Sequence, residues 1–481
     1  METLHTLVIG AGFAGICAAV KLDQAGIADF AVIDKNGGIG GTWYANIYPG
    51  ATCDVASHFY SFSFAPNPDW SQLYSPQPEI RAYMEDVVDR FGVRDRFRLG
   101  QEVAGATWDT DRRGWVVDIS GRDPVFARFL VNAMGLLHRP AWPDIPGRDS
   151  FRGKAMHTAL WDAAYDPAGR RIAVIGSAAS AIQVIPQVAK TAAHVDVYQR
   201  TANYIAPRMD QSYSDEARAL FAKHPETREA HRQEIMERMD TEVYPTLMDP
   251  ARRHLRAAEV NAAMREAVTD PSLHAKLTPD YEFGCKRVLI SDDFYDALNR
   301  DNVDLVTDPI ARITPEGVEM ADGTLRAADT LVFATGFDIR SQYTALDLAG
   351  PGGQRLGVHW SDRVEAYKGV MVAGFPNYFM STGPNTGVGT TSIVHMIEQA
   401  TGWILMAMEA AGPTGTVDVL PTAQSAYNDR IHHDLSGTVW ATGCHSWYRR
   451  PDGRIETLYP GNAADFTREM ETLDRADLHL G

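Results

Sequence analysis

The chain has 481 residues, of which 45% are hydrophobic, enough for two or three domains with a large buried core. It has 45 lysine and arginine residues against 62 aspartate and glutamate residues, which gives a formal net charge of −17 at pH 7. This balance argues for solubility and against a nucleic-acid partner, because phosphate backbones attract basic proteins. Basic residues with a functional role are therefore expected to form a local group that binds one small anion.

The four cysteines, Cys17, Cys53, Cys285 and Cys444, lie far apart and show neither CxxC nor metal-ligand spacing. They are predicted to be free thiols of a reducing compartment. The opening stretch "METLHTLVIGAGFAG" lacks the basic region and cleavage site of a signal peptide. No apolar run is long enough to span a bilayer, so a cytoplasmic enzyme is expected.

In chain order, the first elements are the strand "TLVIG", the turn "AGFAG" and the helix "ICAAVKLDQAG", which should stop at Gly26. The strand "FAVIDK" follows. Residues 171–200 repeat this plan as "RIAVIG", "SAASA", "IQVIPQVAK" and "HVDVYQR". The spaced repeat predicts two nucleotide-binding βαβ units.

The segments between and after these units complete the predicted organisation. "VAGATWDTDRRGWVVDIS" and "FARFLVNAMG" are expected to return as strands to the first sheet, and a long helix should follow "STGPNTGVGTTS". The fold class is predicted to be α/β, with two Rossmann-like dinucleotide-binding domains and an inserted helical region. The predicted boundaries are 1–140 and 375–481 for the first domain, 150–209 and 276–374 for the second, and 210–275 for the insert.

The first glycine turn, "GAGFAG", places Gly10, Gly12 and Gly15 at GxGxxG spacing between a strand and a helix. These glycines permit a tight turn, a close approach of backbone to pyrophosphate, and packing of helix on strand. Asp34 lies 24 residues after Gly10, where a carboxylate accepts hydrogen bonds from ribose hydroxyls. An ordinary glycine-rich turn is the alternative. The residues predicted for this site are Gly10, Gly12, Phe13, Ala14, Gly15, Asp34 and Lys35.

The second turn, "GSAASA", has Gly176, Ala178 and Ala181 at the three positions and so departs from the pattern. Arg200 follows Gly176 by the same 24 residues. A guanidinium binds a ribose 2′-phosphate that a carboxylate would repel, which predicts NADPH here. A solvated cation at a strand end is the alternative for Arg200. The residues predicted for this site are Gly176, Ser177, Ala179, Ser180, Arg200 and Thr201.

Two dinucleotide sites in one chain indicate hydride flow from NADPH to FAD. Such a chain serves as a reductase, an oxygenase or a sensor. A dithiol oxidoreductase needs a close cysteine pair in the FAD half, and Cys17 and Cys53 do not form one.

Several further motifs narrow the chemistry. "FRGKAMHTALWD" at 151–162 matches FxGxxxHxxxW(P/D), and "GTWYANIYPGATCD" at 41–54 matches GxWxxxxYPGxxxD. With "GCKR" at 284–287, "FATGFD" at 333–338 and "CHSWY" at 444–448, the chain resembles the type I Baeyer–Villiger monooxygenases over nearly its whole length.

That resemblance implies an enzyme that uses FAD and NADPH with O2 and a ketone. Its product is an ester or lactone, formed through an anionic C4a-peroxyflavin, and sulfides are further substrates. The anion needs a fixed positive charge and the exclusion of water. No metal, nucleic acid or membrane span is expected, and the oligomeric state stays open.

The resemblance also assigns roles. Arg287 matches the family's active-site arginine and Asp54 its carboxylate partner; by itself Arg287 is compatible with a surface cation, and Asp54 with a loop cap. His157 is placed on an interdomain linker and not in bond making. Further matches are Lys286, Arg200 and Thr201 for the NADPH phosphate, Thr42, Trp43, Tyr60, Val103 and more loosely Ile393 for FAD, and Trp447 on a mobile loop near the nicotinamide.

After "CHSWY" the chain reads "RRPDGRIETLYPGNAADF", which differs from the glycine- and proline-rich loop of many cyclic-ketone enzymes. Pocket closure and substrate class therefore stay open. Two other functions remain: a flavin monooxygenase that oxygenates only amine or sulfur nucleophiles, and a non-enzymatic flavin redox sensor. The Trp161–Asp162 end of "FRGKAMHTALWD" favours the ketone monooxygenase.

Overall fold

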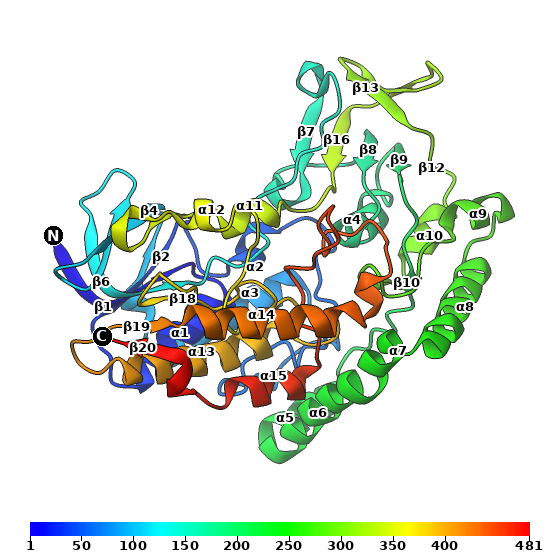
Figure 1. Cartoon of the computed structure of the whole chain (residues 1–481). Helices are drawn as coiled ribbons and strands as arrows, with labels where there is room; N and C mark the ends of the chain where they lie inside the picture. Colours follow the sequence, from blue (N-terminus) through cyan, green and yellow to red (C-terminus); the bar gives the residue numbers. More distant parts are fainter.

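The computed structural model describes the backbone of residues 1–481 and every side chain except those at positions 340 and 342. Two separate sheets organise the chain, and each contains one of the two predicted βαβ units (Figure 1). The predicted α/β class with two Rossmann-like folds is confirmed.

The first sheet has eight strands in the order β17-β4-β5-β6-β1-β2-β3, with β18 paired to β6. Because successive side chains of a strand point to opposite faces, Val8 packs in one core cluster while Leu7 and Ile9 pack in another. Its strands are β1 Glu2–Ile9, β2 Phe30–Asp34, β3 Phe97–Leu99, β4 Val103–Asp109, β5 Gly114–Ile119, β6 Val125–Asn132, β17 Asp347–Ala349 and β18 Tyr378–Met380.

Helices α1 and α13 pack against each other and against one face of this sheet. The predicted apolar face of α13 is buried at Met396, Ile397, Ala400 and Ile404, which fixes the helix in the core. The helices of this part are α1 Phe13–Gln24, α2 Thr42–Ala45, α3 Gln77–Arg90, α11 Arg340–Tyr343, α12 Leu356–His359, α13 Ile393–Ala410, α14 Pro421–Ser436 and α15 Ala463–Met470.

The second sheet has five parallel strands in the order β12-β9-β8-β16-β7, and α4 packs on it with a small three-stranded sheet nearby (Figure 1). Its elements are β7 Lys154–His157, β8 Arg171–Ile175, α4 Ala179–Val188, β9 His194–Tyr198, α10 Phe294–Leu298, β12 Val303–Val306 and β16 Thr330–Phe333. The small sheet comprises β13 Ile310–Thr314, β14 Gly317–Met320 and β15 Leu325–Ala327. Two strand pairs are separate: β10 Ile205–Ala206 with β11 Leu289–Ile290, and β19 Val417–Val419 with β20 Leu478–Leu480.

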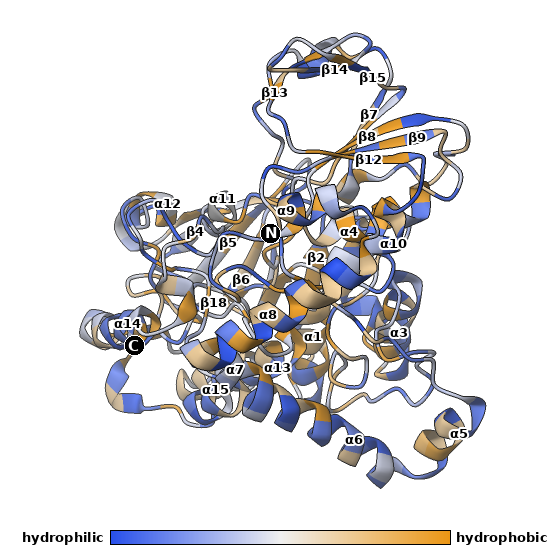
Figure 2. Ribbon diagram, turned by 90° about the vertical axis from the view of Figure 1, so that its right-hand side faces the viewer, coloured by the Kyte–Doolittle hydropathy of each residue, from blue (hydrophilic) through white to orange (hydrophobic). Residues whose placement is uncertain are grey.

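The segment expected to form a helical insert contains α5 Asp215–Lys223, α6 Pro225–Arg238, α7 Tyr244–Met248, α8 Pro250–Ala267 and α9 His274–Leu277. Helix α6 is predominantly hydrophilic (Figure 2), and its buried residues are Arg232 and Ile235. The Nη1 atom of Arg232 donates to the carbonyl oxygens of His58 at 2.8 Å and Ser61 at 2.9 Å. The insert is therefore docked on the first domain.

The chain returns to the first sheet earlier than residue 375. Strand β17 pairs in parallel with β4, and Leu356 and Trp360 lie in the core cluster of that sheet. The predicted boundary is therefore too late, because the short β17 segment "DLA" gives little strand signal in the sequence.

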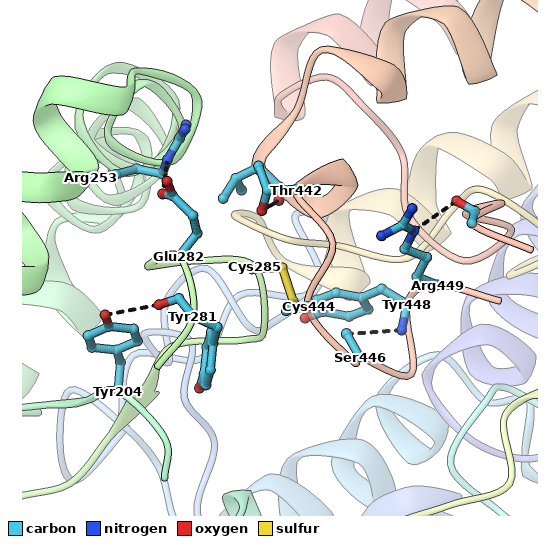
Figure 3. The surroundings of a disulfide bond; sticks show 12 residues. Tyr204, Arg253, Tyr281, Glu282, Cys285, Thr442, Cys444, Ser446, Tyr448 and Arg449 are labelled. Carbon is cyan, nitrogen blue, oxygen red and sulfur yellow. Dashed lines mark hydrogen bonds and ion pairs between the residues drawn. A yellow bond between two sulfur atoms is a disulfide. The ribbon is translucent and has the colours of Figure 1, made fainter. Parts of the chain in front are cut away.

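One prediction about the cysteines is wrong. Cys17 and Cys53 are free, as expected, and both are buried, but Cys285 and Cys444 form a disulfide (Figure 3). The fold brings their Cα atoms to 6.3 Å across 159 residues of sequence, and sequence spacing does not report such a long-range approach.

Among the helices of the described residues, none combines the length and the apolar character needed to cross a bilayer.

Candidate active site

The first glycine turn lies between β1 and α1. Gly10 has a φ of +115°, and a Cβ atom there would lie 2.4 Å from the carbonyl oxygen of Ala133. A Cβ atom at Gly15 would lie 1.8 Å from the carbonyl oxygen of Gly10. These contacts explain why both positions need glycine. Gly12 is the N-cap of α1, and Phe13 and Ala14 form the buried first turn of that helix.

Asp34 stands at the end of β2 and is 9% exposed. Its Oδ2 atom accepts from the Ala11 N–H at 2.7 Å, and its Oδ1 atom accepts from the Asn36 N–H at 2.7 Å. Each carboxylate oxygen has two lone pairs, so each one retains an acceptor position for a ligand hydroxyl. The carboxylate is thus fixed at the glycine turn, with the exposed Lys35 next to it.

The second turn has the backbone of the first despite its alanines. Gly176 has a φ of +119°, close to that of Gly10. Ala178, the N-cap of α4, has φ −93° and ψ −161°, compared with −85° and −166° for Gly12. Alanine adopts this extended conformation without strain, so the methyl group leaves the turn geometry unchanged.

The polar side chains of the second turn are held by neighbours. The Ser180 hydroxyl accepts from Thr158 Oγ1 at 3.3 Å, and the Ser177 carbonyl accepts from Asn203 Nδ2 at 3.0 Å. The adjoining Ala179 is the first residue of α4. Ser177 Oγ also donates to the carbonyl of Thr201 at 3.4 Å, which ties the turn to the end of β9.

Arg200 is exposed just beyond the end of β9. Among the described side chains, no acceptor pairs with its guanidinium. Lys286 lies near Arg200. Burial lowers the pKa of Lys286, the carboxylate of Asp280 opposes this shift, and the positive charge of Arg200 adds to it. Arg200 and Lys286 together offer two positive charges for a phosphate, with the carboxylate of Asp280 also acting on Lys286.

The motif at 41–54 runs from the first fold onto the second. Thr42 and Trp43 begin α2, and the Trp43 Nε1–H donates to the Tyr60 hydroxyl at 3.1 Å. Further along, Gln183 of α4 accepts from the Tyr48 hydroxyl at 2.9 Å and donates to the Thr52 carbonyl at 2.9 Å. The motif therefore bridges the two nucleotide-binding folds.

The last residue of this motif forms the central ion pair of the site. Arg287 Nε donates to Asp54 Oδ2 at 2.6 Å, and the two side chains are 31% and 32% exposed. Burial alone would raise the pKa of Asp54, but the charge and hydrogen bond of Arg287 hold it below its usual value. The charge of Asp54 in turn raises the pKa of Arg287. Both groups are therefore charged at neutral pH.

Tyr448 is a neighbour of this pair that sequence reasoning missed. Its side chain is 2% exposed; burial raises the pKa of its hydroxyl, and the charge of Arg287 partly offsets that rise. Its position directly after Trp447 in "CHSWY" was the available signal. Trp447 itself is 49% exposed and contacts the Tyr448 ring, with centroids 4.3 Å apart.

Two predicted FAD contacts lie on different faces of the first sheet. Ile393 is half-buried at the start of α13, in the same core cluster as Trp43 and Tyr60. Val103 begins β4 and packs against the cluster on the opposite face. Ile393 and Val103 therefore pack against different core clusters.

His157 is fully buried at the crossing between the two folds. Its ring packs against Trp142 and Phe337, with centroids 5.4 Å and 6.2 Å away. The segments that carry these two rings pair with each other, since Ala141 N–H donates to the Gly336 carbonyl at 2.9 Å. This environment fits the linker role expected for His157.

A group with metal-ligating atoms, His194, Asp196 and Asp304, lies on the second sheet, away from the ion pair. Arg326 Nη1 donates to Asp196 at 2.6 Å and to Asp304 at 3.1 Å. The guanidinium of Arg326 thus already offsets one of the two carboxylate charges of this group.

The chain has two nucleotide-binding folds, with opposite charges at equivalent strand ends and a charged pair where the folds meet. These features define a dinucleotide-dependent oxidoreductase. Residues 7–242 match the family model of the pyridine nucleotide-disulphide oxidoreductases.

Comparison of whole chains is more specific. A Baeyer–Villiger monooxygenase of Streptomyces coelicolor is 40% identical over 483 residues, which covers 100% of this chain and 93% of the relative. A cyclohexanone monooxygenase in a closed crystal structure has a TM-score of 0.89 and 31% identity, with 100% and 99% of the two chains covered. OTEMO in complex with FAD and NADP has a TM-score of 0.89 and 28% identity, with 99% of both chains covered. The chain belongs to the Baeyer–Villiger monooxygenase family, as the motifs predicted.

Proposed function

We propose that this protein is an FAD- and NADPH-dependent monooxygenase that inserts one oxygen atom of O2 beside a ketone carbonyl, giving an ester or lactone. The observation that carries the proposal is the Asp54–Arg287 ion pair between the two nucleotide-binding folds. The named relatives and the FAD and NADP complexes of the similar structures support it.

The residues of the first turn fit FAD. A Cβ atom at Gly12 would lie 3.5 Å from the Cα atom of Gly41, an ordinary contact distance, so it is the missing side chain itself that leaves the backbone open to a pyrophosphate. Asp34 supplies a fixed carboxylate for the ribose hydroxyls. Gly10, Gly15 and the N-terminus of α1 complete this half of the site.

The residues of the second turn fit NADPH. Gly176, Ser177 and the N-terminus of α4 face the pyrophosphate position, while Arg200 and Lys286 supply positive charge for a 2′-phosphate. Bound FAD supplies the redox chemistry, which passes electrons from NADPH to O2 and delivers one oxygen atom to the ketone.

Arg287 supplies a fixed positive charge where negative charge develops on oxygen during insertion. Its Nε–H is committed to Asp54, which sets the plane of the guanidinium. Its Nη1 atom contacts the Val388 carbonyl at 3.5 Å, and Tyr448 is a neighbour of the guanidinium; four N–H groups on the two terminal nitrogens leave donors for the reacting oxygen. Asp54 thus positions Arg287 and keeps its charge partly buried, where it acts more strongly than in water.

The experiment is product analysis after NADPH-driven turnover of the purified yellow protein with a panel of ketones and sulfides. Esters or lactones in amounts that match NADPH consumption would support the proposal. Sulfoxides alone would indicate a flavin monooxygenase of soft nucleophiles, and NADPH consumption that no substrate stimulates would indicate a redox sensor. Either result would contradict the proposal.

A further inference from the structure

The disulfide between Cys285 and Cys444 joins two segments that the proposed chemistry uses (Figure 3). Cys285 directly precedes Lys286 and Arg287, and Cys444 stands three residues before Trp447. The bond therefore connects the segment of the active-site arginine covalently to the loop that carries the exposed tryptophan.

The Cys285 side of this link is held in place by several other contacts. The Tyr204 hydroxyl donates to the Tyr281 carbonyl at 3.1 Å, and Arg253 of insert helix α8 pairs with Glu282 at 3.2 Å (Figure 3). Arg287 is fixed by Asp54, and Cys285 is fully buried. This segment is expected to keep its place whether or not the disulfide is formed.

The Cys444 side is held differently. Within the described part of the chain, no hydrogen bond or ion pair joins residues 443–447 to any segment outside residues 438–458. The chain beyond Tyr448 is anchored again, because residues 449–455 form a hairpin in which Arg450 donates to the Asp362 carbonyl at 2.7 Å. Residues 443–447 are therefore a short bridge that, among the described residues, is joined to another element by the disulfide.

We propose that the Cys285–Cys444 disulfide is a redox-responsive tether that positions residues 443–447, and with them Trp447, beside the Lys286–Arg287 segment. The inference deepens the proposed function and rests on it for its effect on turnover. Neither cysteine touches the reacting atoms, so both are positioning residues.

Release of the tether requires a dithiol reductant. Its thiolate attacks Cys444 Sγ, which is half-buried and thus more accessible than the buried Cys285, and the S–S bond breaks with Cys285 as the leaving thiolate. The cationic neighbours Lys286 and Arg287 favour that thiolate. The second reductant thiol then displaces Cys444, so the reductant becomes a disulfide and two electrons and two protons reduce the protein.

The test compares three forms of the full-length holoenzyme: oxidised, treated with dithiothreitol, and the double variant Cys285→Ser/Cys444→Ser. Peptide mapping without reductant identifies the cross-link, and hydrogen exchange measures the opening of residues 443–448. Exchange in both forms without the disulfide is expected to be at least about tenfold faster than in the oxidised form. In the same two forms, the fraction of NADPH that yields hydrogen peroxide instead of product is expected to be higher than in the oxidised form.

The matched control is Cys17→Ala, which removes a buried free thiol in α1. This variant should keep the slow exchange when oxidised and lose it on reduction, like the wild type. Equal exchange in all three forms, or absence of the cross-linked peptide from protein purified without reductant, would overturn the tether. The two readouts test different claims. If hydrogen exchange responds to the disulfide but no ketone is oxygenated, the tether is supported and the proposed function is contradicted. If ketones are oxygenated but exchange does not respond to the disulfide, the proposed function is supported and the tether is contradicted.

Discussion

Asp34 and Arg200 follow equivalent strands of the two nucleotide-binding folds and carry opposite charges. Asp34 is fixed by the backbone N–H groups of Ala11 and Asn36, while Arg200 is exposed and has no acidic partner among the described side chains. A carboxylate suits ribose hydroxyls and a guanidinium suits a phosphate, so the two sites are expected to select different dinucleotides.

This difference predicts the coenzyme preference of Arg200→Asp. Loss of a charge-assisted contact of about 1.5–3 kcal/mol should raise the KM for NADPH by roughly 10- to 100-fold. The KM for NADH, which lacks the 2′-phosphate, should change far less. Steady-state kinetics with both coenzymes measures the effect.

The control for this variant is Arg170→Asp, which makes the same charge change at an exposed position before β8. It should leave both KM values near those of the wild type. A similar loss with NADPH and NADH in Arg200→Asp would mean that Arg200 does not contact the phosphate.

At the scale of single elements, the two glycine turns were predictable because their chemistry is local. Gly10 and Gly176 are fixed by a positive φ, and the strand before each turn and the helix after it are continuous in sequence. The effect of Ala178 was not predictable, because only the structure shows that this residue adopts an ordinary extended backbone.

The docking of the insert was also beyond prediction, because it depends on side chains from distant parts of the chain. His58 of the first domain packs against Tyr213, Phe221 and His231 of the insert region, with ring centroids 4.7–5.3 Å apart. Burial, with the nearby charges of His231, Arg228 and Arg232, lowers the pKa of His58 to about 3. The insert is therefore docked through a histidine that stays neutral.

This pKa gives the interface a pH dependence with a definite sign. An unfolded chain protonates His58 below about pH 6.5, whereas the folded chain resists protonation down to about pH 3, so stability falls as the pH decreases through this window. The loss is at most about 1.4 kcal/mol per pH unit. Between pH 7 and pH 5 the wild-type melting temperature should fall more than that of His58→Phe.

The exposed His254 on α8 provides the matched control. His254→Phe should show the same decrease in melting temperature between pH 7 and pH 5 as the wild type. If His58→Phe also shows that decrease, His58 does not carry the pH dependence of the folded protein.

At the scale of the whole molecule, a single side chain of α4 connects the two nucleotide-binding folds. Gln183 of α4 joins Tyr48 and Thr52 of the first fold through both atoms of its amide. Because Asp54 follows Thr52 by two residues, these bonds also place the carboxylate that holds Arg287. The arrangement of the folds and the geometry of the ion pair are thus coupled.

Gln183→Ala tests this coupling. The variant should bind FAD normally, because the first turn is untouched, while kcat for ketone oxygenation should fall roughly tenfold through the loss of hydrogen bonds worth about 1 kcal/mol each. Gln187→Ala is the matched control one turn along α4, since Gln187 bonds instead to Asp293, beyond β11, at 3.3 Å. Equal effects of the two variants on kcat would remove Gln183 from this role.

Motif order in the sequence pointed to Asp54 and Arg287 as one pair, and the structure places them in contact although they lie 233 residues apart. Their contact itself followed from family resemblance and not from spacing. The Cys285–Cys444 bond had no local pattern, and the one signal for Tyr448 was its place next to Trp447 in "CHSWY", because both arise from the return of the C-terminal loop to the site. Long-range approach of this kind depends on the packing of the complete fold.

The most direct measurement of the central claim is the yield of ester and of hydrogen peroxide per NADPH in Arg287→Ala. The account predicts retained FAD, continued NADPH consumption, and an ester yield lower by roughly 100-fold or more, because the fixed positive charge is lost. Arg252→Ala, at an exposed position on α8, should match the wild type. Ester formation by Arg287→Ala at a rate near that of the wild type would contradict the account.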